Sequence, residues 1–148
     1  HIIETSCAIK AAVVEKDERE NRHRMILNFG HTFGHSIETL TNYTEYLHGE
    51  ALAIGMVQAA WLSVETGLCT EDVPMRITSL LKKIGLPTQP PNLKPKDIIK
   101  SMYYDKKTSH NKLRFILAKD IGSIEIVDDV LEIPIKTVLE KNNLKKSD

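Results

Sequence analysis

Cysteine, net charge and long apolar runs are all scarce in this sequence, and each shortage argues against a class of protein. The two cysteines, Cys7 and Cys69, lie far apart without CxxC spacing, which argues against a disulfide framework and favours a reducing, cytoplasmic location. The 20 basic and 20 acidic residues balance, whereas nucleic-acid-binding surfaces usually carry a basic excess. The longest apolar stretch, residues 51–62, is interrupted by Gln58 and is too short to cross a bilayer. We therefore expect neither a nucleic-acid partner nor a membrane partner.

The pattern of apolar and helix-breaking residues predicts a mainly α domain with one small β-hairpin. Helix-like apolar spacing begins at once, in residues 1–18, and the most apolar segment, from His48 to about Glu65, is expected to be a central helix that Gly67 ends. Further helices are expected at 25–40, 70–85, 96–104 and 134–142, and the hairpin strands at 112–118 and 123–127. The chain opens with His1 inside a helical pattern, so we expect residues 1–148 to be a fragment of a longer protein.

A stripe of polar residues distinguishes the expected helix at 25–40. Arg24, Asn28, His31, His35 and Glu38 are spaced by three or four residues, which on a continuous helix places them within roughly 80° of one another. A solvated helix face also collects polar residues, but it usually carries Lys, Glu and Asp rather than two histidines and an asparagine. Two glycines interrupt the stripe, and they are useful where another backbone or a ligand must come close. The stripe is therefore either a functional face or an unusual solvated one.

Histidines in this region are candidate ligands for a metal ion. His31 and His35 are four residues apart, so both imidazoles can point toward one site, but Thr32 replaces the glutamate of the HExxH protease motif. His48 begins the next expected helix, and a helical hairpin would bring it beside His31. A third ligand is commonly a carboxylate, and spacing alone does not choose among Asp17, Glu38 and Glu50. The alternative is that His48 only caps a buried helix.

Positive side chains that could converge on an anion lie in three separate segments. Lys10 is on the first expected helix, Arg24 follows a charged run, and Lys106 and Lys107 follow the fifth expected helix. Each alone is most simply a solvated charge, and together they would suit a carboxylate or a phosphate.

Several ordered motifs resemble those of 3-dehydroquinate synthases. They comprise Lys10–Val14, Asp17–Glu20, Arg24, the run from Leu27 to Glu38 (LNFGHTFGHSIE), His48–Glu50, Gly55–Met56, Gly85–Pro87 and Asp105–Lys107. The ordered set extends from Lys10 to about Leu117, which makes it far more specific than any single motif.

This resemblance implies a fold, a reaction and cofactors. Such enzymes join an NAD-binding N-terminal domain to a helical C-terminal domain, bind zinc or cobalt, and act as homodimers. They convert the sugar phosphate 3-deoxy-D-arabino-heptulosonate 7-phosphate to 3-dehydroquinate and phosphate in the shikimate pathway. Residues 1–148 would then be the helical C-terminal metal- and substrate-binding domain, with the NAD-binding domain absent.

The resemblance also implies roles for individual residues. His31 and His48 correspond to two of three metal ligands, and Lys10 and Arg24 to the residues that hold the substrate carboxylate. Asn28, His35 and one of Lys106 or Lys107 correspond to residues that contact the phosphate and nearby hydroxyls, with His35 as a proton carrier. Apart from the resemblance, Glu38 lies one turn beyond His35 and is expected to fix the tautomer of that imidazole. The third metal ligand, a glutamate, lies upstream in the family, so the chain alone is expected to bind metal weakly and to show no turnover.

Three alternatives remain open at this point. Another sugar phosphate cyclase, such as a 2-deoxy-scyllo-inosose or valiolone-type synthase, would share the metal and NAD chemistry. An iron-type alcohol or glycerol dehydrogenase would share the architecture but not the run from Asn28 to His35. A helical interaction domain without catalysis would leave Lys10, Arg24 and His31 apart and solvated.

Overall fold

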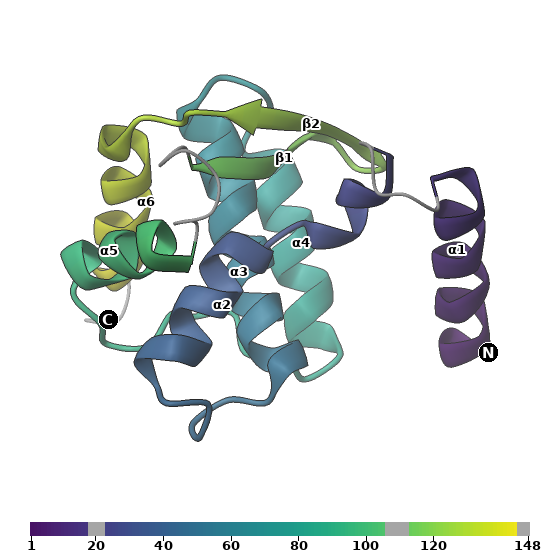
Figure 1. Cartoon of the computed structure of the whole chain (residues 1–148), viewed down its shortest axis with the longest axis horizontal. Coiled ribbons are helices and arrows are strands. Elements are labelled where there is room, and N and C mark those ends of the chain that lie inside the picture. The colour runs from purple at the N-terminus through teal and green to yellow at the C-terminus, as the bar shows by residue number, and fades with distance from the viewer. Residues whose placement is uncertain (18–22, 106–112, 145–148) are drawn as a thin grey trace.

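The computed structural model describes residues 1–17, 23–105 and 113–144, which form a helical domain with one hairpin (Figure 1). In chain order the elements are α1 (Ile2–Lys16), the 3₁₀ helix η1 (His23–Asn28), α2 (His31–Leu40), α3 (His48–Glu65), α4 (Asp72–Lys83), α5 (Pro95–Asp105), β1 (Arg114–Asp120), β2 (Ser123–Asp128) and α6 (Glu132–Leu144). The expected fold class, mainly α with one small hairpin, is confirmed.

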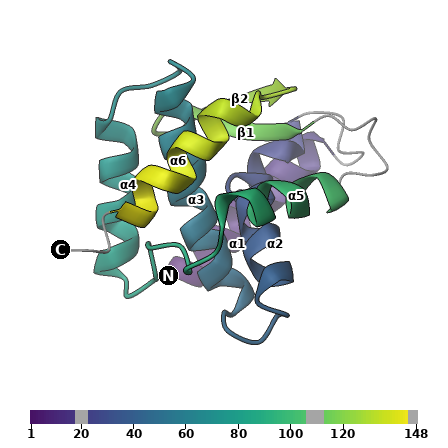
Figure 2. The same cartoon turned by 90° about the vertical axis from the view of Figure 1, so that its left-hand side faces the viewer.

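Helix α3 is the centre of the fold, as its sequence predicted. It contacts α2, α4, α6 and β1, so most of its faces meet protein rather than water (Figure 2). Ala51, Ile54 and Leu62 are fully buried along its length. A helix enclosed on this many sides carries no solvated polar face, which explains why its apolar residues show no clear periodicity.

The main core lies between α3, the hairpin and the helices α5 and α6. Phe33 of α2 packs against Phe115 of β1, with ring centroids 5.4 Å apart. Ser63 joins the layers through a polar contact: its buried hydroxyl donates to the carbonyl of Ala59 and accepts the backbone N–H of Ala118 at 2.9 Å. Helix α3 is thereby fixed to the strand that borders the candidate site.

The single helix expected at 25–40 is wrong, because the chain divides there into η1 and α2. Gly30 separates the two elements with a left-handed φ of +84°, and α2 begins at His31. The cause is tertiary: a Cβ at Gly30 would lie 2.5 Å from the backbone nitrogen of Met56 on α3. Arg24 and Asn28 therefore do not share one helical stripe with the histidines.

The other expected elements are confirmed, with ends that differ by a few residues. Helix α3 has the expected bounds, and Gly67 and Gly85 follow α3 and α4 in the left-handed conformation that ends helices. The strands pair antiparallel, with Arg114 opposite Asp128 and an irregularity between Ala118 and Asp120.

Helix α1 lies at one side of the described chain, where it contacts η1 (Figure 1). Its side chains are largely exposed, including Ile2 and Ile3 at about four fifths exposure, and Val13 is its buried residue. Within the described residues, no helix is both long enough and apolar enough to traverse a bilayer.

Candidate metal and substrate site

Three glycines bring α2 and α3 into backbone contact beside the candidate site. A Cβ at Gly55 would lie 2.2 Å from the carbonyl oxygen of Gly30 and 2.8 Å from the nitrogen of Gly34, so no side chain fits there. Gly34 in turn faces Leu52 and the carbonyl of Ala51. The sequence-based interpretation of Gly30 and Gly34 as positions of close approach is therefore confirmed. The contact holds the histidines of α2 next to the beginning of α3.

Three imidazoles gather at this junction. The ring centroids of His31 and His35 are 5.3 Å apart, those of His31 and His48 are 6.0 Å apart, and those of His35 and His48 are 6.1 Å apart. His31 and His35 come from successive turns of α2, and His48 is the first residue of α3. Residues 31 and 48 thus face one another across the helix pair.

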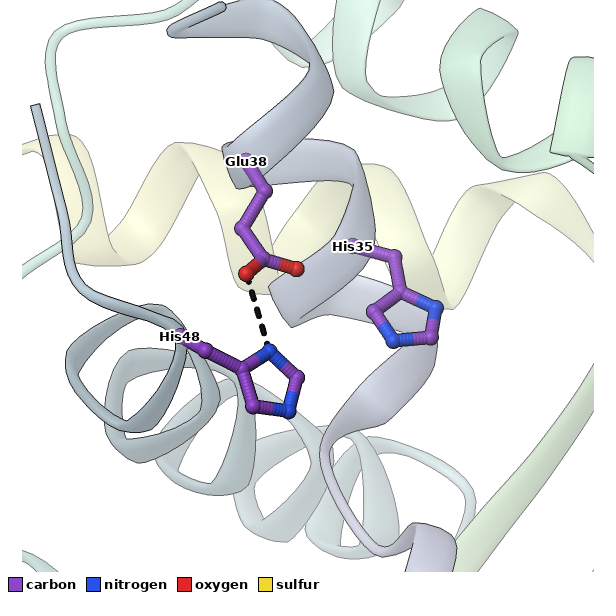
Figure 3. A group of neighbouring side chains, drawn as sticks. All are labelled: His35, Glu38 and His48. Carbon is purple, nitrogen blue, oxygen red and sulfur yellow. Dashed lines mark hydrogen bonds and ion pairs between the residues drawn. The ribbon is translucent and has the colours of Figure 1, made fainter. Parts of the chain in front are cut away.

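Glu38 binds His48 and thereby links the two helices (Figure 3). Its carboxylate oxygen Oε1 lies 2.9 Å from Nδ1 of His48, and the Glu38 side chain is only 8% exposed against 60% for His48. The sequence suggested His35 as the partner of Glu38, but the bond goes to His48. When Nδ1 donates to this carboxylate, Nε2 of His48 keeps its lone pair for a cation.

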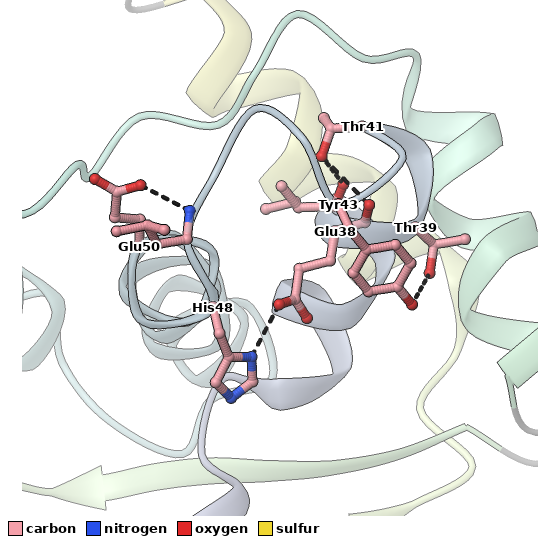
Figure 4. Close-up of polar contacts among 8 residues, drawn as sticks. Glu38, Thr39, Thr41, Tyr43, His48 and Glu50 are labelled. Carbon is pink, nitrogen blue, oxygen red and sulfur yellow. Dashed lines mark hydrogen bonds and ion pairs between the residues drawn. The ribbon is translucent and has the colours of Figure 1, made fainter.

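The structure separates the three carboxylates that sequence spacing left equivalent, and Figure 4 shows two of them, Glu38 and Glu50. Glu38 contacts the histidine cluster. Glu50 accepts the backbone N–H of Leu47 at 2.8 Å and so caps α3, and Asp17 accepts the backbone N–H of Arg24 at 3.1 Å. Among the described residues, the ligand atoms of His35, Glu38 and His48 all lie within 4.8 Å of one another, which is a spacing that one metal ion can bridge.

The imidazole of His31 has properties that suit the binding of a cation. Burial is the main cause that lowers the pKa of His31, and the nearby imidazoles of His35 and His48 lower it further. The backbone of Phe29 acts in the other direction and raises this pKa. Its Nδ1 atom is buried and meets no hydrogen-bonding partner among the residues that the structure describes. A neutral imidazole offers a lone pair, so the donor set of this cluster fits a divalent metal of the zinc type.

A hollow of about 200 Å³ opens beside the histidines. Asn28, His31 and His35 line it. The remaining lining side chains are Met25, Thr32, Arg114 and Ile116. Sequence reasoning missed Arg114, because nothing in the strand sequence relates it to a helix 80 residues away. The Thr32 hydroxyl donates a hydrogen bond to the carbonyl of Arg114 at 3.2 Å, and Phe33 packs against Phe115 beside it.

The positively charged residues that were expected to bind an anion, and that the structure describes, do not line this hollow. Lys10 is exposed on α1, and Arg24, half-buried in η1, is not among the residues that line the hollow. Lys106 and Lys107 lie outside the described residues. The hypothesis of a helical interaction domain expected Lys10, Arg24 and His31 to lie apart and solvated. Lys10 is exposed, as that hypothesis expected, whereas His31 is partly buried and lies beside His35 and His48.

Comparison with known proteins identifies the family. The sequence model described as 3-dehydroquinate synthase C-terminal matches residues 1–108. The 3-dehydroquinate synthase of Desulforamulus reducens is 50% identical over 141 residues, which are 95% of this chain and 39% of that protein. The 3-dehydroquinate synthase of Geotalea uraniireducens is 47% identical over 133 residues, which are 88% of this chain and 37% of that protein. The chain therefore spans about two fifths of the length of these relatives.

Solved structures of related cyclases share the fold. The 2-epi-5-epi-valiolone synthase ValA from Streptomyces hygroscopicus, solved with NAD+ and Zn2+ bound, matches 90% of this chain and 37% of its own with a TM-score of 0.77 at 26% identity. A 2-deoxy-scyllo-inosose synthase complexed with carbaglucose-6-phosphate, NAD+ and Co2+ matches 91% of this chain and 40% of its own with a TM-score of 0.78 at 28% identity. Sequence and structure agree, and the chain belongs to the 3-dehydroquinate synthase C-terminal family.

Proposed function

We propose that this chain is the metal- and substrate-binding domain of a 3-dehydroquinate synthase. The whole protein would convert 3-deoxy-D-arabino-heptulosonate 7-phosphate to 3-dehydroquinate and phosphate, as a phosphate-eliminating lyase of the shikimate pathway. The observation that carries the proposal is the gathering of His31, His35 and His48 with the buried Glu38 beside a hollow lined by Asn28. A further part of the polypeptide, absent from residues 1–148, would supply the NAD site and the glutamate that completes the metal site.

His31 and His48 would hold the metal, zinc or cobalt. The support is their 6.0 Å ring separation, the orphaned and buried Nδ1 of His31, and the carboxylate that sets the ring of His48. When bound, a divalent cation polarises the hydroxyl that is oxidised and stabilises its negative charge. Glu38 would make His48 a better ligand, because a carboxylate bonded to one ring nitrogen fixes the tautomer and the orientation of the imidazole.

Asn28 and His35 would hold and orient the substrate in the hollow. The amide of Asn28 can donate to a phosphate or hydroxyl oxygen, and the imidazole of His35 can accept and donate a proton. The substrate's phosphate can serve as the base for its own elimination, so these side chains mainly orient the reacting groups. The family resemblance supports Lys10 and Arg24 as ligands of the substrate carboxylate, and one of Lys106 or Lys107 as a phosphate ligand. A cytoplasmic homodimer is the form that the resemblance favours for the whole protein.

A chimera tests this proposal most directly. The segment of the Desulforamulus reducens enzyme that aligns with this chain would be replaced by residues 1–148, and the product would be assayed with 3-deoxy-D-arabino-heptulosonate 7-phosphate and NAD. We expect release of 3-dehydroquinate and phosphate, and loss of both in the His48→Ala chimera. A folded chimera that binds NAD and cobalt but makes no 3-dehydroquinate would refute the proposal, with the unaltered enzyme as the positive control.

The runner-up function is another sugar phosphate cyclase, and the TM-scores of 0.77 and 0.78 favour keeping it. The presence of both Lys10 and Arg24 favours a substrate with a carboxylate instead. Offering the same chimera a sugar phosphate without a carboxylate separates the two functions, because its turnover in preference to the carboxylate-bearing substrate would support the alternative.

A further inference from the structure

Arg114 lies where the hairpin reaches the histidine cluster. It is the first residue of β1 and pairs across the hairpin with Asp128, whose carboxylate accepts a hydrogen bond from Nε of the guanidinium. Its backbone carbonyl accepts the hydroxyl of Thr32, which lies between His31 and His35 in sequence on α2. The backbone of Arg114 is therefore bonded to α2, and its side chain is bonded to the neighbouring strand β2.

The geometry leaves most of the guanidinium available to a ligand. Arginine has five N–H donors, and the bond to Asp128 uses the one on Nε. The side chain is 46% exposed and lines the same hollow as Asn28 and His35. Met25 and Ile116 complete the lining with apolar surface, so an anion bound there would meet less competing water. A fixed, planar and permanently positive group at such a place suits an oxyanion.

We propose that Arg114 binds the phosphate group of the substrate, together with Asn28 and His35. The identity of this ligand rests on the proposed function, whereas the oxyanion site itself follows from the hollow and its lining. Asp128 holds the guanidinium so that less rotamer freedom is lost on binding. The competing explanation is that the Arg114–Asp128 pair only stabilises the hairpin, as exposed cross-strand ion pairs do weakly.

Titration of the 148-residue chain with inorganic phosphate, followed by NMR, separates these explanations. We expect phosphate to shift the side-chain resonances of Asn28, His35 and Arg114, and acetate to shift them much less. Arg114→Gln should raise the phosphate Kd roughly tenfold or more, and Arg114→Lys by a smaller factor because it keeps the charge but loses the fork. Arg76→Gln is the matched control, since Arg76 is also exposed and ion-paired, to Asp72 on α4, but lies outside the hollow.

The outcomes separate this inference from the proposed function. Equal Kd values for wild type, Arg114→Gln and Arg76→Gln would overturn the inference, as would tighter binding of acetate than of phosphate. Thermal unfolding of each variant shows whether a change in Kd merely follows lost stability, which would also count against it. The titration needs neither turnover nor a metal, so a chimera without activity would leave its result intact. In an active chimera, Arg114→Gln should raise KM more than it lowers kcat.

Discussion

Replacing Gly55 with alanine would force α2 and α3 apart at the contact that positions the histidines. The added Cβ would lie 2.2 Å from the Gly30 oxygen and 2.8 Å from the Gly34 nitrogen, where ordinary contacts begin at 3.4 Å. Both obstructing atoms belong to the backbone, so no side-chain rotation relieves the overlap. Overpacking of this kind costs roughly 1–3 kcal/mol, while alanine in a helix gains about 0.5–1 kcal/mol over glycine. Because two backbone atoms clash, we expect a net loss of about 2 kcal/mol in the free energy of unfolding.

Urea unfolding followed by circular dichroism would measure this loss, and Co2+ titration would measure its effect on the site. Gly49→Ala is the matched control, because Gly49 lies on the same helix beside His48 and a Cβ there meets nothing within 4 Å. The melting temperature of Gly55→Ala should fall by about 4–8 °C, given the usual 2–4 °C per kcal/mol for a chain of this size. Co2+ affinity should fall as well, since metal ligands tolerate little displacement. Equal stability and equal Co2+ affinity in the two variants would refute this account of the helix contact.

Three further predictions test other contacts. Glu38→Gln removes the negative charge of the carboxylate that bonds to His48, and it should weaken Co2+ binding by roughly 10–100-fold. The control Glu45→Gln, at an exposed position, should leave the Co2+ affinity unchanged. Equal affinities of the two variants would contradict the role given to Glu38. Ser63→Ala leaves the buried N–H of Ala118 without its hydrogen bond to the serine hydroxyl, and it should lower the free energy of unfolding by about 1–3 kcal/mol in urea titrations. The control Ser79→Ala, on the exposed face of α4, should leave the free energy of unfolding nearly unchanged. Burial, with a smaller contribution from the charge of Asp120, raises the pKa of the Cys69 thiol. Because the thiolate is the reactive form, alkylation of Cys69 by iodoacetamide should reach half its maximal rate at a higher pH than alkylation of free cysteine. Mass spectrometry of the alkylated protein measures this rate.

Local sequence patterns were sufficient for most of the fold, whereas the roles expected of the site residues came from the resemblance to a known family. The bounds of α3, the ends of α3 and α4 at left-handed glycines, and the hairpin all follow from short-range apolar spacing and breakers. The proximity of His31 to His48 followed from the expected helical hairpin, and the ring separation of 6.0 Å agrees with it.

What the sequence could not predict depends on contacts between distant segments. The division of the expected helix at 25–40 is set by the close approach of Gly30 to Met56, which lies on another helix. Glu38 bonds to His48 rather than to His35 because of the way α2 and α3 pack. The sequence alone did not decide between the two histidines. Arg114 lies at the site because β1 contacts η1 and α2. The local apolar pattern of the sequence does not predict these contacts.

His31 and His48 are proposed to bind one divalent cation between them. Co2+ titration of the chain, with the paramagnetic shifts of the histidine ring protons as the readout, tests it in wild type and in the His31→Ala, His48→Ala and His35→Ala variants. We predict that His31→Ala and His48→Ala each abolish binding at millimolar Co2+, while His35→Ala retains it. Unchanged affinity in His31→Ala combined with loss in His35→Ala would contradict the claim and would assign the cation to His35, Glu38 and His48, whose ligand atoms already lie within 4.8 Å of one another.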